Sequence, residues 1–272
     1  MPTVLLLDVS LSMARVSSSV SGNTHTNTTP TSTSDLHFDQ HEHEAEQKKQ
    51  NGSGSKESSV TKLSLAVQSV YRFLDELGHQ AKLEHVALVI FSSLWEVAVP
   101  FTRDYDTIKE TILDIVLYDK TCLTAAFGAA HDVIQEMWSG ASMPCQVVVI
   151  TDGLVDVTPE LFSKLEDSAF PSNYNFHMHC VSGMSEFCCH QNIDKLTKLM
   201  ESIGGTISVP DGVASVNAVE KLMEKYVHNA YKIYSGSLHC GSLSSTVQLY
   251  PPPTSAVKKT ISRMKNYNSH MI

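Results

Sequence analysis

Near its start the chain reads Val4-Leu5-Leu6-Leu7-Asp8-Val9-Ser10-Leu11-Ser12, an apolar run joined to a carboxylate and two hydroxyls at alternate positions. A continuous apolar run is typical of a strand buried on both faces of a parallel sheet. Oxygen ligands at this spacing suit a hard divalent cation such as Mg²⁺, which usually binds one or two carboxylates and keeps other positions open. Taken alone, the triplet is equally consistent with polar residues at the start of a helix.

Two further oxygen ligands follow where a parallel sheet would place them. Asp152 ends the apolar run 147–151, and Thr121 precedes an amphipathic helical stripe at 123–137. Ligands of open α/β sheets bind beyond the carboxyl ends of the strands, at the point where the strand order reverses. Three segments distant in the sequence are therefore expected to meet, and the predicted metal site consists of Asp8, Ser10, Ser12, Thr121 and Asp152.

From residue 60 onward, helical and strand patterns alternate. Helices are predicted around 63–77, 123–137, 193–203 and 216–226, and strands at 86–91, 95–101, 147–151, 176–181 and 206–209. Pro100 places its strand at a sheet edge, since proline cannot donate to a ladder. This alternation predicts a doubly wound α/β domain with a mostly parallel, Rossmann-like sheet that ends near residue 230. His177 and His179 share one strand face, where packing is favoured over metal binding.

Composition is that of an intracellular globular chain. Its 272 residues are 42% hydrophobic, enough for one large domain and part of a second. No apolar run reaches the roughly 20 residues of a membrane span, and the start lacks the basic residues of a signal peptide. The net charge of −9 argues against a surface that wraps nucleic acid. The six cysteines include no Cys-x-x-Cys pair, so reduced thiols are favoured over a zinc half-site at Cys188-Cys189.

Two segments depart from this pattern. In residues 17–59, Ser, Thr and Asn occupy 14 of the first 19 positions, which predicts a disordered insertion beside the metal loop. The patterns of residues 232–241 and 245–250 predict two strands around a Gly/Ser turn, stopped by three prolines. Residues 231–253 are thus expected to be the first strands of an incomplete β-rich domain, and 254–272 a disordered basic tail.

The five predicted ligands resemble the metal-ion-dependent adhesion site of von Willebrand factor A domains. That resemblance implies one Mg²⁺ or Mn²⁺ bound directly by the hydroxyls of Ser10 and Ser12. It also implies that Thr121, Asp8 and Asp152 bind the ion directly or through water. The remaining coordination position would be filled by a carboxylate of a partner protein.

A more specific resemblance rests on long, unusual strings at 91–105, 118–123 and 144–148. They are similar to an A-domain subunit family of the Integrator complex. The resemblance implies a non-catalytic scaffold that binds proteins, acts in snRNA 3′-end processing and transcription attenuation, and resides in the nucleus or also in the cytoplasm. It implies asunder-like subunit 13 and subunit 10 as partners, with nucleic acid contacted indirectly. In that family a β-barrel follows the A domain, so a truncated form is expected here.

An enzyme is the alternative interpretation. Aspartyl-phosphate phosphatases also have an Asp at a strand end, and a second Asp two residues later protonates the leaving group. Here that position is Ser10, and Lys120 directly precedes Thr121 instead of standing in a separate motif. The sequence therefore favours a binding module over a metal-dependent hydrolase.

Overall fold

A computed structural model describes residues 1–17, 60–81, 84–138, 144–155, 157–167, 174–187, 190–232 and 234–249. The predicted disordered segment, apart from Ser17, lies outside the described residues. So do the basic tail 254–272 and the Cys188-Cys189 pair.

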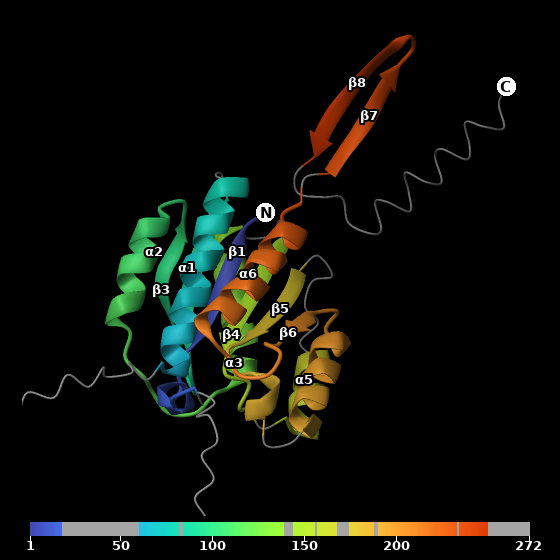
Figure 1. Ribbon diagram of the computed structural model, residues 1–272. Helices are drawn as coiled ribbons and strands as arrows, with labels where there is room; N and C mark the ends of the chain where they lie inside the picture. Colours follow the sequence, from blue (N-terminus) through green and yellow to red (C-terminus); the bar gives the residue numbers. More distant parts are fainter. Residues whose placement is uncertain are drawn as a thin grey trace, which may run out of the picture.

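A six-stranded sheet forms the centre of the domain (Figure 1). Its strand order is β3-β2-β1-β4-β5-β6, and every neighbouring pair is parallel except β2 and β3. The strands are β1 (Thr3–Asp8), β2 (Val86–Phe91), β3 (Trp95–Thr102), β4 (Cys145–Thr151), β5 (Tyr174–Cys180) and β6 (Thr206–Ser208). The doubly wound, mostly parallel sheet is thus confirmed, and the strand containing Pro100 lies at its edge.

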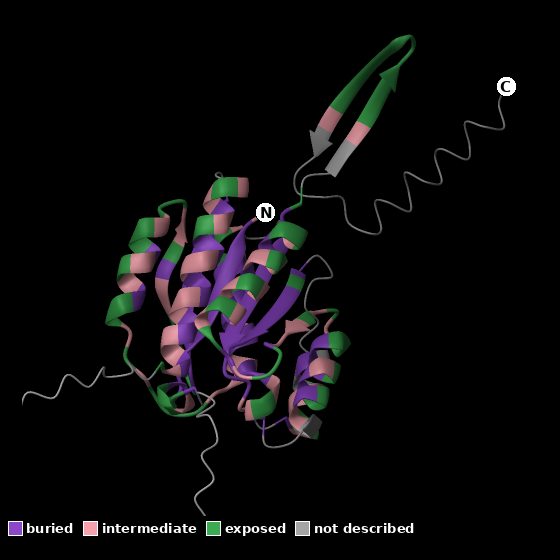
Figure 2. Cartoon of the chain, viewed as in Figure 1, coloured by how far each residue is buried: buried purple, intermediate pink, exposed green. Residues whose placement is uncertain are grey.

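Helices cover both faces of the sheet. One core lies under α1 (Lys62–Gln80), α2 (Tyr105–Thr111) and α6 (Val216–Ala230). The other lies under α3 (Leu123–Met137), α4 (Pro159–Asp167) and α5 (His190–Ser202). Short 3₁₀ helices occur at η1 (Leu11–Ala14), η2 (Ile112–Asp114) and η3 (Met184–Glu186). Figure 2 shows the sheet as the most buried layer, with exposed residues on the outer sides of the helices.

Strand β1 contributes to both cores. Leu5 and Leu7 belong to one core and Val4 and Leu6 to the other, and all four are completely buried. Successive side chains of a strand point to opposite faces, so a strand in the middle of the sheet needs apolar residues at every position. This explains the continuous apolar run before Asp8.

Helix α2 was not predicted from the sequence. Asp104 accepts a hydrogen bond from the backbone N–H of Thr107 at 3.3 Å, which caps the first turn. Ile108 and Ile112, four residues apart, are both buried against the core. The helix is seven residues long and contains one aliphatic residue, Ile108, which is too few to give a clear period.

The two ends of the Ser/Thr-rich segment meet. Val16 and Thr61 form an antiparallel bridge, and the N–H of Ser17 donates to the carbonyl of Val60 at 2.8 Å. Ser17 was predicted to be disordered, but its hydroxyl donates to the carbonyl of Ala214 at 2.8 Å and the residue is buried. The chain therefore leaves and re-enters the domain at one place.

Beyond α6, strands β7 (Tyr234–Cys240) and β8 (Leu243–Leu249) form an antiparallel hairpin. The two strands predicted at this place are therefore present. Gly241 takes a positive φ of 60° at the turn, a conformation that glycine adopts without steric cost. Leu238 and Leu243 are exposed. None of the helices in the described part of the chain is both long and apolar enough to cross a membrane.

His177 and His179 have packing roles. The Nδ1 of His177 is hydrogen-bonded to Thr206, its ring stacks on Tyr226 at 4.0 Å, and both histidines contact the hydroxyl of Ser208. The Nε2 of His179 lies 3.1 Å from the hydroxyl of Ser69 on α1. Burial lowers the pKa of His177 to about 4; burial, and then the neighbouring His177, lower the pKa of His179 to about 3. Both rings are therefore neutral in the folded protein at physiological pH.

These histidines should make the fold sensitive to acid. Below the ordinary pKa of 6.5 the unfolded chain takes up protons that the folded chain cannot, so the free energy of unfolding falls as pH decreases. At about pH 5 each histidine should cost about 2 kcal/mol relative to neutral pH. Urea unfolding at both pH values should show this loss reduced in His179→Gln and retained in His228→Gln, which alters an exposed histidine of α6. Equal losses in the two variants would contradict this assignment.

Candidate metal site at the carboxyl edge of the sheet

The predicted ligands lie at the carboxyl edge of β1 and β4. Within the sheet Leu7 pairs with Ile150, so the residues that follow these two strands are neighbours. The link between η2 and α3 runs beside the loop after β1, where Ser10 and Tyr118 form a parallel bridge. The N–H of Tyr118 donates to the carbonyl of Val9 at 2.7 Å. Backbone pairing therefore brings the segment containing Thr121 to the end of β1.

Four of the five predicted ligands form one hydrogen-bonded chain. The hydroxyls of Ser10 and Ser12 lie 2.9 Å apart. The hydroxyl of Thr121 lies 2.9 Å from that of Ser10 and 3.2 Å from Oδ2 of Asp8. These contacts gather one carboxylate and three hydroxyls around a common point.

Asp8 is completely buried, and each of its carboxylate oxygens accepts a hydrogen bond. Its Oδ1 accepts from the backbone N–H of Ser10 at 2.9 Å, and its Oδ2 accepts from the hydroxyl of Thr151 at 2.6 Å. Burial is the largest effect and raises the pKa of Asp8 to about 6, although these hydrogen bonds oppose it. The nearby Asp152 raises that pKa further. The hydrogen bonds of Asp8 therefore offset only part of the cost of burying its carboxylate.

Asp152 gives the clearest sign that a cation fits here. It is completely buried, and its Oδ1 accepts a hydrogen bond from the N–H of Leu154 at 2.9 Å. Its Oδ2 is also buried and has no hydrogen-bond partner among the described residues. A buried carboxylate oxygen without a partner is costly unless a positive charge reaches it. Two carboxylates and three hydroxyls form the oxygen-rich set that Mg²⁺ or Mn²⁺ prefers.

Thr151 was not among the predicted ligands, but it positions one of them. Besides donating to Asp8, its hydroxyl accepts a hydrogen bond from the N–H of Gly153 at 3.2 Å. A threonine as the last residue of a buried strand, immediately before Asp152, is the signal that could have indicated this role. It orients the Asp8 carboxylate from the neighbouring strand, much as outer residues orient metal ligands.

A buried ion pair lies beside the site and has no signature in the sequence. Lys62, the first residue of α1, is ion-paired with Glu186 of η3, and the two side chains are 5% and 10% exposed. Glu186 also accepts hydrogen bonds from the backbone N–H groups of Gly183 at 3.2 Å and Ala214 at 3.0 Å. Burial lowers the pKa of Lys62 to about 8, and the charge of Asp152 opposes this shift. The carboxylate of Glu186 thereby joins the start of α1 to the two loops that contain Gly183 and Ala214, at the carboxyl edge of the sheet.

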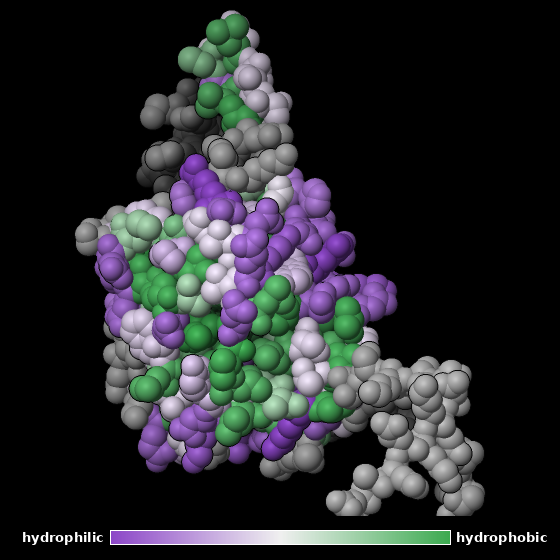
Figure 3. Space-filling view, turned by 90° about the vertical axis from the view of Figure 1, so that its left-hand side faces the viewer, coloured by the Kyte–Doolittle hydropathy of each residue, from purple (hydrophilic) through white to green (hydrophobic). Residues whose placement is uncertain are grey.

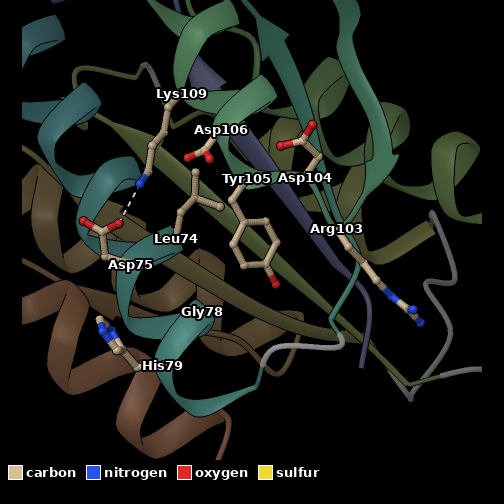
Figure 4. Close-up of a pocket in the computed structure, with 9 residues that line it drawn as sticks. All are labelled: Leu74, Asp75, Gly78, His79, Arg103, Asp104, Tyr105, Asp106 and Lys109. Atoms are coloured by element: carbon tan, nitrogen blue, oxygen red, sulfur yellow. Dashed lines mark hydrogen bonds and ion pairs between the residues drawn. The ribbon is translucent and has the colours of Figure 1, made fainter.

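The other features that could bind small ligands lie elsewhere. A pocket of about 430 Å³ is lined by residues of α1 and α2, among them Asp75 and Lys109, which form an ion pair at 2.6 Å (Figure 4). It contains none of the predicted metal ligands. Within the described ranges, no group of three or more His, Cys, Asp or Glu side chains could hold a metal. Cys145 and Cys180 are buried, reduced cysteines, as predicted.

Breaking the buried pair should destabilise the domain. Glu186→Leu leaves the Lys62 ammonium buried without its partner and should cost about 3 to 5 kcal/mol of unfolding free energy. Lys62→Met combined with Glu186→Leu should recover part of that loss, because no buried charge remains, although the N–H groups of Gly183 and Ala214 still lack their acceptor. Lys109→Met is the matched control, since it breaks a partly exposed pair and should cost less than about 1 kcal/mol. Urea unfolding measures all three; the prediction fails if Glu186→Leu costs no more than the control.

Comparison with known proteins agrees with this architecture. The family model of the von Willebrand factor type A domain matches residues 51–154, a range that includes Thr121 and Asp152. The von Willebrand factor type A structure from Catenulispora acidiphila superposes with a TM-score of 0.54 at 12% identity, covering 87% of this chain and 44% of the other. The SpRpn10 VWA domain gives a TM-score of 0.51 at 10% identity, covering 81% and 92%. The chain therefore has the fold of von Willebrand factor A domains.

Within this class the chain is similar to Integrator complex subunit 14. It is 34% identical to that protein from Xenopus tropicalis over 203 residues, which are 70% of this chain and 39% of the relative. The human protein is 32% identical over the same lengths, and the Drosophila melanogaster protein is 27% identical over 231 residues, 71% of this chain and 39% of the relative. The family resemblance expected from the sequence is thus confirmed. The chain spans about two fifths of the length of these curated relatives.

Proposed function

We propose that this chain is a non-catalytic, protein-binding subunit of an Integrator complex that binds partners through a divalent metal ion. The ion, Mg²⁺ or Mn²⁺, would be held by Asp8, Ser10, Ser12, Thr121 and Asp152. The observation that carries the proposal is the unpartnered, buried Oδ2 of Asp152 at the edge where the other four side chains meet. The ion would supply an electrophilic centre with a free coordination position for a carboxylate of the partner.

The protein's own residues prepare this edge for binding. Thr151 and the N–H of Ser10 fix the Asp8 carboxylate, and the hydroxyls of Ser10, Ser12 and Thr121 are already close together. Pre-positioned ligands lower the entropic cost of capturing the ion. Such a site holds its ligand and returns it unchanged, which is the behaviour of a scaffold.

Metal binding tests the site directly. Asp8→Ala and Asp8→Asn should weaken Mn²⁺ binding in titration calorimetry by about 100-fold or more, because even changes outside the ligand shell cost 10- to 100-fold. Mn²⁺ should also raise the unfolding temperature of the unmodified chain but not of these variants. Asp75→Ala, an aspartate in the pocket between α1 and α2, should bind Mn²⁺ normally. Equal Mn²⁺ affinity of Asp8→Asn and the unmodified chain would refute the ligand assignment.

Membership of the complex is supported by the similarity to Integrator complex subunit 14. We infer that the chain works in the nucleus, in snRNA 3′-end processing and transcription attenuation, with asunder-like subunit 13 and subunit 10 as partners. Tagged chain purified from nuclear extract should bring down these subunits, as identified by mass spectrometry. Recovery of the tagged chain without any Integrator subunit would overturn this part of the proposal.

We expect the chain to have no phosphatase activity. Both oxygens of Asp8 accept hydrogen bonds, and Ser10 occupies the position at which the phosphatase mechanism needs its general acid. With Mg²⁺ present, the purified protein should hydrolyse p-nitrophenyl phosphate no faster than Asp8→Asn does. Metal-dependent turnover that disappears in Asp8→Asn would instead establish a hydrolase.

A further inference from the structure

Exposed apolar side chains lie around the carboxyl edge of the sheet, beside the candidate metal site. Leu94 is 78% exposed and Leu113 is 69% exposed, values that are unusual for large aliphatic residues. Figure 3 shows hydrophobic residues gathered over the lower part of the face that carries β3 and α2. Six exposed residues at this edge form a surface that we name the apolar rim: Leu11, Leu94, Trp95, Leu113, Val116 and Tyr118.

The backbone ties the apolar rim to the metal ligands. Leu11 lies between Ser10 and Ser12, and its N–H donates to the carbonyl of Asp119 at 3.0 Å. Tyr118 forms the bridge with Ser10. Trp95 pairs with Phe91, which in turn pairs with Asp8 in the sheet. The rim and the candidate metal site therefore occupy one continuous edge of the molecule.

We propose that the apolar rim is the docking surface for a protein segment that carries a carboxylate next to large apolar side chains. This inference rests on the proposed function, since the carboxylate would take the free position on the metal. The apolar side chains of the same segment would cover the rim. Contiguous exposed apolar surface bordered by polar groups marks an interaction site in soluble proteins.

The electrostatics of the candidate metal site and its continuity with the apolar rim favour a segment that is both acidic and apolar. Asp8 and Asp152 offset the charge of a divalent ion, and α3 begins beside the site with a first turn that no side chain caps. The free N–H groups and positive end of that helix favour an anionic partner. The rim itself consists of uncharged side chains, so affinity beyond the metal bond has to come from apolar burial.

Selection from random peptides tests the proposal whichever protein the partner is. A phage-displayed library of random peptides is selected on the full Mn²⁺-loaded chain and eluted with EDTA. The selected peptides should contain Asp or Glu next to Leu, Ile, Phe or Trp. Binding of one synthetic peptide is then measured on the unmodified chain, on the double variant Leu94→Ser/Val116→Ser, and on Met137→Ser, which alters an exposed residue at the far end of α3.

The double variant should bind the peptide roughly tenfold more weakly or worse, since it removes two apolar contacts, while its Mn²⁺ affinity stays unchanged. Met137→Ser should bind the peptide normally. If acidic peptides bind all three proteins equally, the apolar rim is not a docking surface. The proposed metal-dependent function would not be affected by that result. Calorimetry that shows no Mn²⁺ binding by the unmodified chain would reject the proposed function itself, and with it this inference.

Discussion

Burial of the Asp8 carboxylate at the end of the central strand is the constraint around which this domain is arranged. The strand must be apolar at every position because both of its faces meet a core, yet it ends in a group that strongly prefers water. The surroundings compensate with hydroxyl and N–H donors from three segments. Even so, burial outweighs these hydrogen bonds and raises the pKa of Asp8 to about 6.

The same edge carries the features that connect fold to function. The link from η2 to α3 delivers Thr121 because its backbone pairs with the loop after β1. The Lys62–Glu186 pair fixes the start of α1 close to Asp152, at the place where the chain returns from residues 18–59. The apolar rim adds uncharged surface beside these polar groups. Metal binding and partner binding would therefore be properties of one edge of the molecule.

Much of this architecture follows from periodicity. The strands and long helices were predictable because a buried strand needs an uninterrupted apolar run and an amphipathic helix a repeating stripe. The meeting of the five candidate ligands was predictable because each lies at the end of a strand or before a helix at the same edge. Helix α2 was not, since one aliphatic residue in seven gives no period. The boundary at Ser17 was also missed, because its hydrogen bond depends on Ala214, about 200 residues away.

The sequence by itself determined the α/β class, the edge position of the strand with Pro100, the candidate ligands and the similarity to Integrator complex subunit 14. The tertiary structure alone decided which oxygens touch, that Thr151 holds Asp8, that Lys62 pairs with Glu186, and that six exposed apolar residues share one rim. The physical reason is the distance along the chain over which each interaction acts. Strand and helix patterns depend on neighbours along the chain, whereas desolvation and hydrogen bonding depend on segments that only folding brings together.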